Sequence, residues 1–237
     1  MAIFADEFFG TIGGGHLEFE AIAEAQRYLS ANASLSGLPL EKRFALGPSL
    51  GQCCGGALVL RFESVTANDT LRLQKILQDL TDHSFKPLAL FGGGHVGKAL
   101  VQVLAPLPFH VRWIDSRDEI FPENVPAQVM CEHSNPVQAA VLDLVPQSRV
   151  LIMSFSHAED LDIVAACLLR NRQHKDLPFI GLIGSATKWA TFKRRLAERG
   201  FSEAECQQVT CPIGVPGITG KEPEVIAVAV AAQLLQA

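Results

Sequence analysis

The sequence predicts an α/β protein in which a larger C-terminal part with a parallel sheet follows a smaller N-terminal α+β part. From Lys86 onward, short apolar runs alternate with amphipathic segments of helical length, as in parallel sheets that are buried on both faces. The first apolar run ends in the turn Gly92-Gly93-Gly94-His95-Val96-Gly97, which opens the first helical segment. The second run ends in Asp115. This combination is typical of a Rossmann-like domain.

The C-terminal elements are expected in regular succession, and we assign residues 85–237 to this domain. Short apolar runs predict strands over residues 87–91, 110–115, 127–131, 149–155 and 178–184. Patterns of helical period predict helices over Val96–Leu104, Pro136–Leu144, Ala158–Arg172, Thr187–Arg199 and Glu224–Gln236.

Residues 1–84 are expected to form the smaller α+β domain. Two apolar runs flank Asp6-Glu7 and predict a hairpin, and a run at Ala57–Phe62 predicts a further strand. Amphipathic spacing predicts helices over Leu17–Leu29 and Asn68–Leu80, with Asn68 as the cap of the second.

Composition excludes several classes of protein. The 237 residues are 48% hydrophobic and carry a net charge of −5 without a basic run, so a nucleic-acid partner is not expected. No apolar stretch approaches the roughly 20 residues that span a bilayer, and the first residues lack the basic start of a signal peptide. The six cysteines form neither a CxxC pair nor a zinc pattern, so we expect free thiols in the cytoplasm.

The glycine turn has the spacing of a dinucleotide-binding motif. Gly92 would allow the tight turn, Gly94 the approach of a phosphate, and Gly97 close packing of helix on strand. Asp115 would accept hydrogen bonds from ribose hydroxyls, or Arg117 would pair a phosphate instead. NAD(P) or another nucleotide is therefore one expected ligand, and a scaffold whose turn binds nothing is the alternative.

An oxidoreductase would also need a proton-transfer group near the nicotinamide. His157, Glu159 and Asp160 follow the fourth expected strand and so belong to the carboxyl edge of the sheet, where ligands bind. A nucleotide-sensing interaction module without a cofactor of its own is a further alternative.

The segment Gly51–Gly56 holds two adjacent cysteines, Cys53 and Cys54, between glycines. Flanking glycines permit close approach of the backbone to a ligand, and thiolates suit soft metals or sulfur chemistry. The alternative is a tight turn with two buried thiols.

Six stretches, in order along the chain, resemble the xanthine dehydrogenase accessory protein (XdhC-like) family. They are GTIGGGHLE (Gly10–Glu18), LGPSLGQCCGG (Leu46–Gly56), LFGGGHVGKAL (Leu90–Leu100), WIDSRDEIFP (Trp113–Pro122), FIGLIGSATKWATFKRRL (Phe179–Leu196) and CPIGVPGITGKEPEVIAVAVAAQLL (Cys211–Leu235).

The resemblance implies a non-catalytic protein that binds the molybdenum cofactor (molybdopterin) and protects it. Such proteins dock a cysteine desulfurase that sulfurates the cofactor, and then deliver it to an apo xanthine dehydrogenase-type enzyme. In the family a cysteine of the Cys-Gly-Gly loop is implicated in binding, so the role passes first to Cys54, as a contact to the molybdenum centre, and second to Cys53. We also expect a homodimer.

The phosphate of such a cofactor has two candidate cradles, because both glycine turns open a helix. One is Gly13-Gly14-Gly15 with His16, and the other is the turn from Gly92 to Gly97 with His95. Ser185 and Lys188 follow the fifth strand and could contact a ligand, although Lys188 could equally be a solvated helix residue. Cys211 is a second-rank thiol candidate.

Two features depart from the family pattern. The family has several dozen residues before its GTIGGG stretch, so we expect this chain, which starts at Met1, to lack the usual N-terminal segment. The family often has His-x-His after the fourth strand, where this chain keeps only His157.

Overall fold

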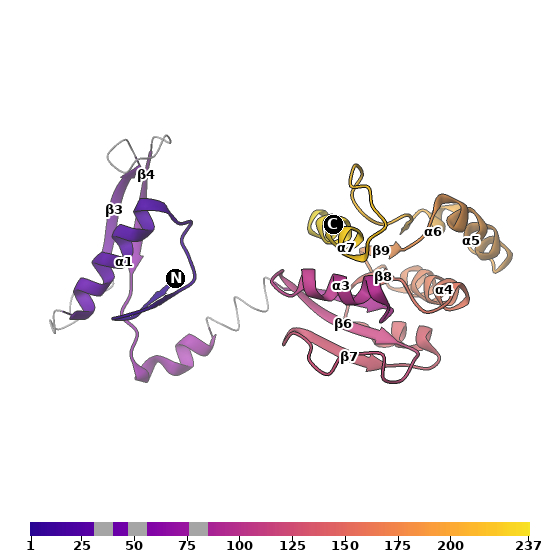
Figure 1. The fold of residues 1–237 in the computed structure, drawn as a ribbon, viewed down its shortest axis with the longest axis horizontal. Coiled ribbons are helices and arrows are strands. Elements are labelled where there is room, and N and C mark those ends of the chain that lie inside the picture. The colour runs from indigo at the N-terminus through magenta and orange to yellow at the C-terminus, as the bar shows by residue number, and fades with distance from the viewer. Residues whose placement is uncertain (31–39, 47–55, 76–84) are drawn as a thin grey trace. The chain divides into compact units, whose positions relative to one another are not determined.

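The computed structural model describes residues 1–30, 40–46, 56–75 and 85–237. The chain forms two compact units, Met1–Gln78 and Asp79–Ala237, which are considered one at a time (Figure 1). Cys53 and Cys54 lie outside the described residues.

The C-terminal unit is built on a six-stranded parallel sheet. Its spatial order is β10-β9-β8-β5-β6-β7. The strands are β5 (Lys86–Phe91), β6 (Phe109–Asp115), β7 (Val129–His133), β8 (Arg149–Ile152), β9 (Phe179–Leu182) and β10 (Val209–Thr210). The predicted Rossmann-like α/β fold is confirmed. The chain order reverses between β5 and β8, and ligands of such sheets bind beside the carboxyl ends of the strands at this reversal.

Helices cover both faces of the sheet (Figure 1). On one face, α3 (His95–Leu104) and α7 (Pro223–Gln236) pack against β5, β6 and β8. On the other face lie η3 (Val137–Asp143), α4 (His157–Gln173), α5 (Ala186–Glu198) and α6 (Glu203–Cys206). Leu88 and Leu90 of β5 point to the first layer, and Ala89 and Phe91 to the second, so this central strand is apolar on both sides.

Four elements differ from the sequence prediction. β7 begins two residues later than expected, and residues 137–143 form a 3₁₀-helix instead of an α-helix. β10 and α6 were not predicted because each is too short to show a period. The single turn of α6 is stabilised by a capping box, in which Ser202 and Glu205 bond each other's backbone N–H groups.

The N-terminal unit combines two small antiparallel sheets with a helix. β1 (Ala2–Ile3) pairs with β2 (Phe8–Phe9), and β3 (Leu40–Leu46) pairs with β4 (Gly56–Phe62). The helix α1 (Gly15–Ser30) buries Leu17 and Ala21, and Phe44 of β3 is buried as well. This agrees with the predicted smaller α+β region.

The segment after β4 corrects one prediction. Thr66, and not Asn68, caps the 3₁₀ turn η2 (Ala67–Asp69) that leads into helical residues 70–75. The Thr66 hydroxyl accepts the Asn68 N–H, and the Asp69 carboxylate accepts the Thr66 N–H at 2.8 Å. Thr66 has the extended backbone that a cap requires. No helix in the described part of the chain is both long and apolar enough to cross a bilayer.

Candidate functional site

Two glycines of the turn after β5 are required by packing. Gly92 has φ +122°, and a Cβ there would overlap the Met153 carbonyl group at the end of β8. A Cβ on Gly97 would overlap the Gly92 carbonyl oxygen, which also accepts the indole N–H of Trp113 at 2.8 Å. Helix α3 therefore sits directly on the turn, at the point where β5 and β8 separate.

Gly94 has no such structural requirement. It is the N-cap of α3 with φ −71°, and a Cβ there would meet nothing within 4 Å. Within the described residues, the backbone N–H groups of residues 94–97 have no acceptor. The missing side chain thus leaves the approach to these donors open, and His95 beside it is exposed. Such a helix start is suited to an anion.

Asp115 is fully engaged by its own chain. Its Oδ2 accepts the Gly93 N–H at 2.6 Å and an Arg117 Nη2–H at 2.8 Å. Its Oδ1 accepts the backbone N–H and the Nε–H of Arg117, both at 2.9 Å. Burial opposes ionisation, but these hydrogen bonds and the Arg117 charge outweigh it and lower the pKa of Asp115.

The expected role of Asp115 as a ribose acceptor is therefore not met by this geometry. A carboxylate offers about four acceptor positions, and all four are used. Arg117 is likewise bound to Asp115 through Nε and Nη2, so these two donors are not available to a phosphate, as the alternative supposed.

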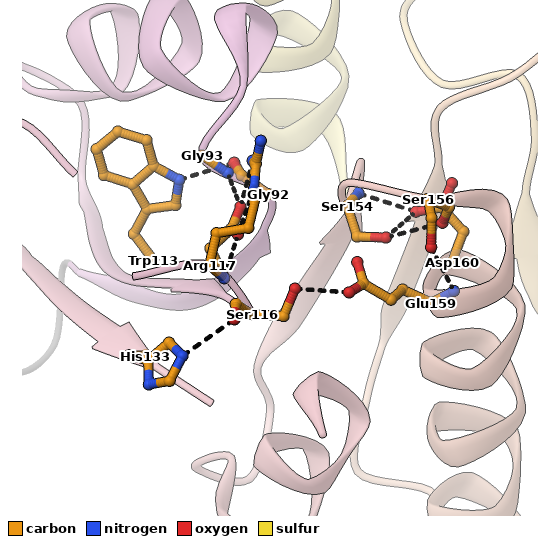
Figure 2. Close-up of polar contacts among 11 residues, drawn as sticks. Gly92, Gly93, Trp113, Ser116, Arg117, His133, Ser154, Ser156, Glu159 and Asp160 are labelled. Carbon is orange, nitrogen blue, oxygen red and sulfur yellow. Dashed lines mark hydrogen bonds and ion pairs between the residues drawn. The ribbon is translucent and has the colours of Figure 1, made fainter. Parts of the chain in front are cut away.

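Two contacts cross the carboxyl end of β5, and Figure 2 shows the second of them, between Ser116 and Glu159. Arg117, which follows β6, lies over the ring of Phe155, which follows β8, at 4.7 Å from the ring centroid. Next to it, Ser116 donates to Glu159 Oε1 at 2.5 Å. The second carboxylate oxygen of Glu159 is buried, and no hydrogen-bond donor from the described residues reaches it. Because β5 lies between β6 and β8, both contacts bridge the reversal point of the sheet.

The N-terminal glycine turn differs from this one in a decisive residue. Glu18 folds back over it, and its Oε2 accepts N–H groups of Ile12 at 2.8 Å and of Gly14 at 3.1 Å, together with the hydroxyl of Thr11. The Thr11 hydrogen bond, followed by that of Ile12, lowers the pKa of Glu18. In the sequence echo GGGHLE and GGGHVG, Glu18 stands where the second turn has Gly97. A carboxylate of the chain thus fills the anion position of the first turn.

The other residues around the first turn have local partners. His16 lies 3.4 Å from Glu20 and stacks on the exposed ring of Phe19. Gly13 and Gly15, like Gly14, have positive φ, which favours glycine in this turn.

Lys188 is a buried ion-pair partner, which corrects its interpretation as a solvated residue. Its side chain is 10% exposed, and Nζ lies 2.6 Å from Asp160 Oδ2 and 2.8 Å from the Ile183 carbonyl oxygen. Asp160 Oδ1 in turn accepts the N–H and the hydroxyl of Ser154, each at 2.8 Å. Asp160 therefore orders the loop after β8 and is not free for proton transfer.

Ser185 is exposed and caps α5 by accepting the Lys188 N–H at 3.2 Å.

The remaining histidine and cysteine candidates lie in different parts of the C-terminal unit. His157 is exposed at the start of α4, with its ring edge-on to Phe192. Cys211 is partly buried, and burial raises the pKa of its thiol. Cys167 is fully buried, and burial raises its pKa to about 12, in keeping with the predicted role as a small buried hydrophobe. Among the described residues, no three His, Cys, Asp or Glu side chains cluster as a metal site.

Sequence reasoning missed the contacts of Phe155, Ser116 and Glu18. Phe155 continues an apolar run and therefore has the pattern of a strand residue, yet it is 66% exposed. The echo of the two glycine turns is visible in the sequence. That Glu18 fills the first turn, while the second keeps free donors, depends on the folded chain.

Family models match both ends of the chain. The XdhC Rossmann domain matches residues 88–234, and the XdhC and CoxI family matches residues 1–36.

One protein is similar to the whole chain. The uncharacterized protein YqeB of Escherichia coli (strain K12) is 30% identical over 243 aligned positions, which include all of this chain and 40% of YqeB. The chain thus spans less than half the length of this relative.

One solved structure is similar in fold over nearly the whole chain. A crystal structure described as a xanthine dehydrogenase from Bacillus halodurans has a TM-score of 0.75 at 20% identity, covering 96% of this chain and 82% of that one. A Rossmann-fold NAD(P)-binding family protein from Shigella flexneri is 15% identical over 62% of this chain and 85% of that one. Its TM-score of 0.45 is too low to support an inference. The two family matches confirm the resemblance read from the sequence, and the chain belongs to the XdhC family.

Proposed function

We propose that this protein is an accessory factor that binds the molybdenum cofactor, supports its sulfuration and delivers it to a xanthine dehydrogenase-type enzyme. The observation that carries the proposal is that XdhC-type models match the beginning of the chain and the Rossmann-like unit together. Between the two matches lies the Cys53-Cys54 loop. The partners would be the apo-enzyme and a cysteine desulfurase, and we propose a homodimer as the working form.

The geometry favours one of the two glycine turns for the cofactor phosphate. In the first turn Glu18 already occupies the donors, and a phosphate would have to displace it. In the second, the N–H groups of residues 94–97 have no partner in the described part of the chain, and Gly94 leaves them accessible. We therefore assign the phosphate to the start of α3, where the helix dipole adds to the attraction.

Cys54, with Cys53 as its neighbour, is assigned separately as the soft contact to the molybdenum centre. A thiolate is a suitable ligand for a soft metal centre or its sulfido group. The bound cofactor supplies the redox chemistry of the client enzyme, and the chaperone contributes binding and protection.

The alternative of an NAD(P)-dependent oxidoreductase gains no support from the site. Asp115 has no acceptor position left for a ribose, and Asp160 is bound to Lys188 and Ser154. Neither the acceptor nor that proton-transfer candidate is free in this geometry.

The proposal is tested by purifying the protein from cells that make the cofactor and measuring bound pterin as its fluorescent oxidation product. We expect pterin in the wild type and several-fold less in Gly94→Val, whose side chain would cover the free N–H groups. Cys53→Ala/Cys54→Ala should also lose pterin, while Cys131→Ala, which removes a thiol from β7, serves as the matched control. A wild type without pterin would contradict the function, and equal pterin in the double variant would contradict the thiol contact.

A further inference from the structure

The position of Asp115 is the one at which dinucleotide-binding Rossmann domains hold the adenosine ribose. Such a carboxylate must have oxygens free to accept the two ribose hydroxyls. Here three of its four hydrogen bonds come from a single residue, Arg117, and the fourth comes from Gly93. Asp115 is 2% exposed, so solvent and solutes do not reach it while Arg117 is in place.

Arg117 is held in this position from more than one side. Its Nε and Nη2 form a two-pronged pair with Asp115, which is the strongest arrangement for a guanidinium and a carboxylate. Its planar group also lies over Phe155, across the end of β5. A ribose could offer only two neutral O–H donors in exchange for these charged ones, so the exchange is unfavourable.

Glu159 also interacts with the Arg117 cation. One of its oxygens binds Ser116, and the other is buried without a donor among the described residues. The hydrogen bond to Asp115 and, to a smaller extent, the charge of Glu159 raise the pKa of Arg117. Arg117 is therefore the cation placed between two carboxylates from different sides of the reversal point. Removing it would leave both uncompensated, which opposes its displacement by a ligand.

From this arrangement we propose that Arg117 is a specificity-determining residue, which excludes the adenosine ribose of dinucleotides from the glycine turn and leaves the turn to ligands without such a ribose. The inference rests on the proposed function in one respect: it takes the glycine turn to be the cofactor site from which the adenosine ribose is excluded. The free N–H groups at residues 94–97 remain open to a phosphate, because Arg117 blocks Asp115 and not the start of α3.

The test is calorimetric titration of the full chain with NAD⁺ and with NADP⁺. We expect neither to bind the wild type below millimolar concentration. In Arg117→Ala, the freed Asp115 should accept the ribose hydroxyls and raise the NAD⁺ affinity at least tenfold. NADP⁺ should gain little, because its 2′-phosphate would meet the Asp115 carboxylate. A merely structural loosening would change both affinities alike.

Arg112→Ala is the matched control, since Arg112 lies on β6, the strand that Arg117 follows, and pairs with Glu132 of β7. Arg117→Lys covers the case in which the alanine variant does not fold: an ammonium cannot form the two-pronged pair, so a smaller gain for NAD⁺ is expected. Three results would overturn the inference: binding of either dinucleotide to the wild type, no increase in NAD⁺ affinity in the folded variants, or an equal increase in affinity for both dinucleotides. The pterin content of the wild type reports on the proposed function separately, so either idea can fail alone.

Discussion

Gly97→Ala gives the sharpest test of how the glycine turn is built. The added Cβ would overlap the Gly92 carbonyl oxygen and lie 3.2 Å from the Gly92 carbonyl carbon. It would also lie 3.4 Å from the Trp113 indole nitrogen, which donates to that same oxygen. Because these atoms belong to buried backbone and a buried ring, α3 has to move away from β5.

The expected cost follows from two contributions. Overpacking of a close-packed interior costs about 1–3 kcal/mol. Weakening the hydrogen bond between Trp113 and Gly92 costs about 1 kcal/mol more. We therefore expect the free energy of unfolding of the C-terminal unit to fall by roughly 2–4 kcal/mol, or roughly 1–2 M in the urea midpoint.

Tryptophan fluorescence during urea unfolding is the assay, because both tryptophans, Trp113 and Trp189, belong to the C-terminal unit. Gly94→Ala is the matched control. Its Cβ meets nothing, and the lower entropy of the unfolded chain offsets the poorer N-cap, so a change within about 0.5 kcal/mol is expected. Equal midpoints for Gly97→Ala and the wild type would refute the packing argument.

Two further predictions concern buried charge. Lys188→Met leaves the Asp160 carboxylate, whose side chain is 3% exposed, without its cation, so the free energy of unfolding measured in urea should fall by about 3–5 kcal/mol. The double variant Lys188→Met/Asp160→Asn should recover part of this loss, and no recovery would argue against a stabilising ion pair. The pKa of Asp115 is lowered in the folded state, so its contribution to stability is present above its ordinary pKa of about 3.9 and is lost as the pH falls through the lower folded value. The wild type should therefore lose more stability than Asp115→Asn between about pH 5 and pH 2, and parallel pH profiles would contradict this.

Local pattern was sufficient for most of the fold. The apolar runs located β5, β6, β8 and β9, because strands buried on both faces must be apolar along their length. The glycine turn located the start of α3, and the order of the matching stretches indicated the XdhC family. Short elements such as β10 could not be predicted, because two residues are too few to show a hydrophobic period.

The partners of the polar groups could not be obtained in this way. Ser116 and Glu159 are 43 positions apart, and Asp160 and Lys188 are 28 apart, so nothing in the local pattern joins them. Their pairing depends on which strand ends become neighbours in the sheet.

The sequence by itself therefore determined the Rossmann-like sheet, the two glycine turns and the family, since each depends on residues that are close in the chain. Tertiary structure alone decided which turn keeps free donors. In the first turn Glu18 supplies the anion, and in the second Asp115 takes only the Gly93 N–H and is itself covered by Arg117. The physical reason is that an anion site consists of unpaired donors. Which donors stay unpaired depends on how the chain folds back on itself, over four residues between Gly14 and Glu18 and over 22 between Gly93 and Asp115.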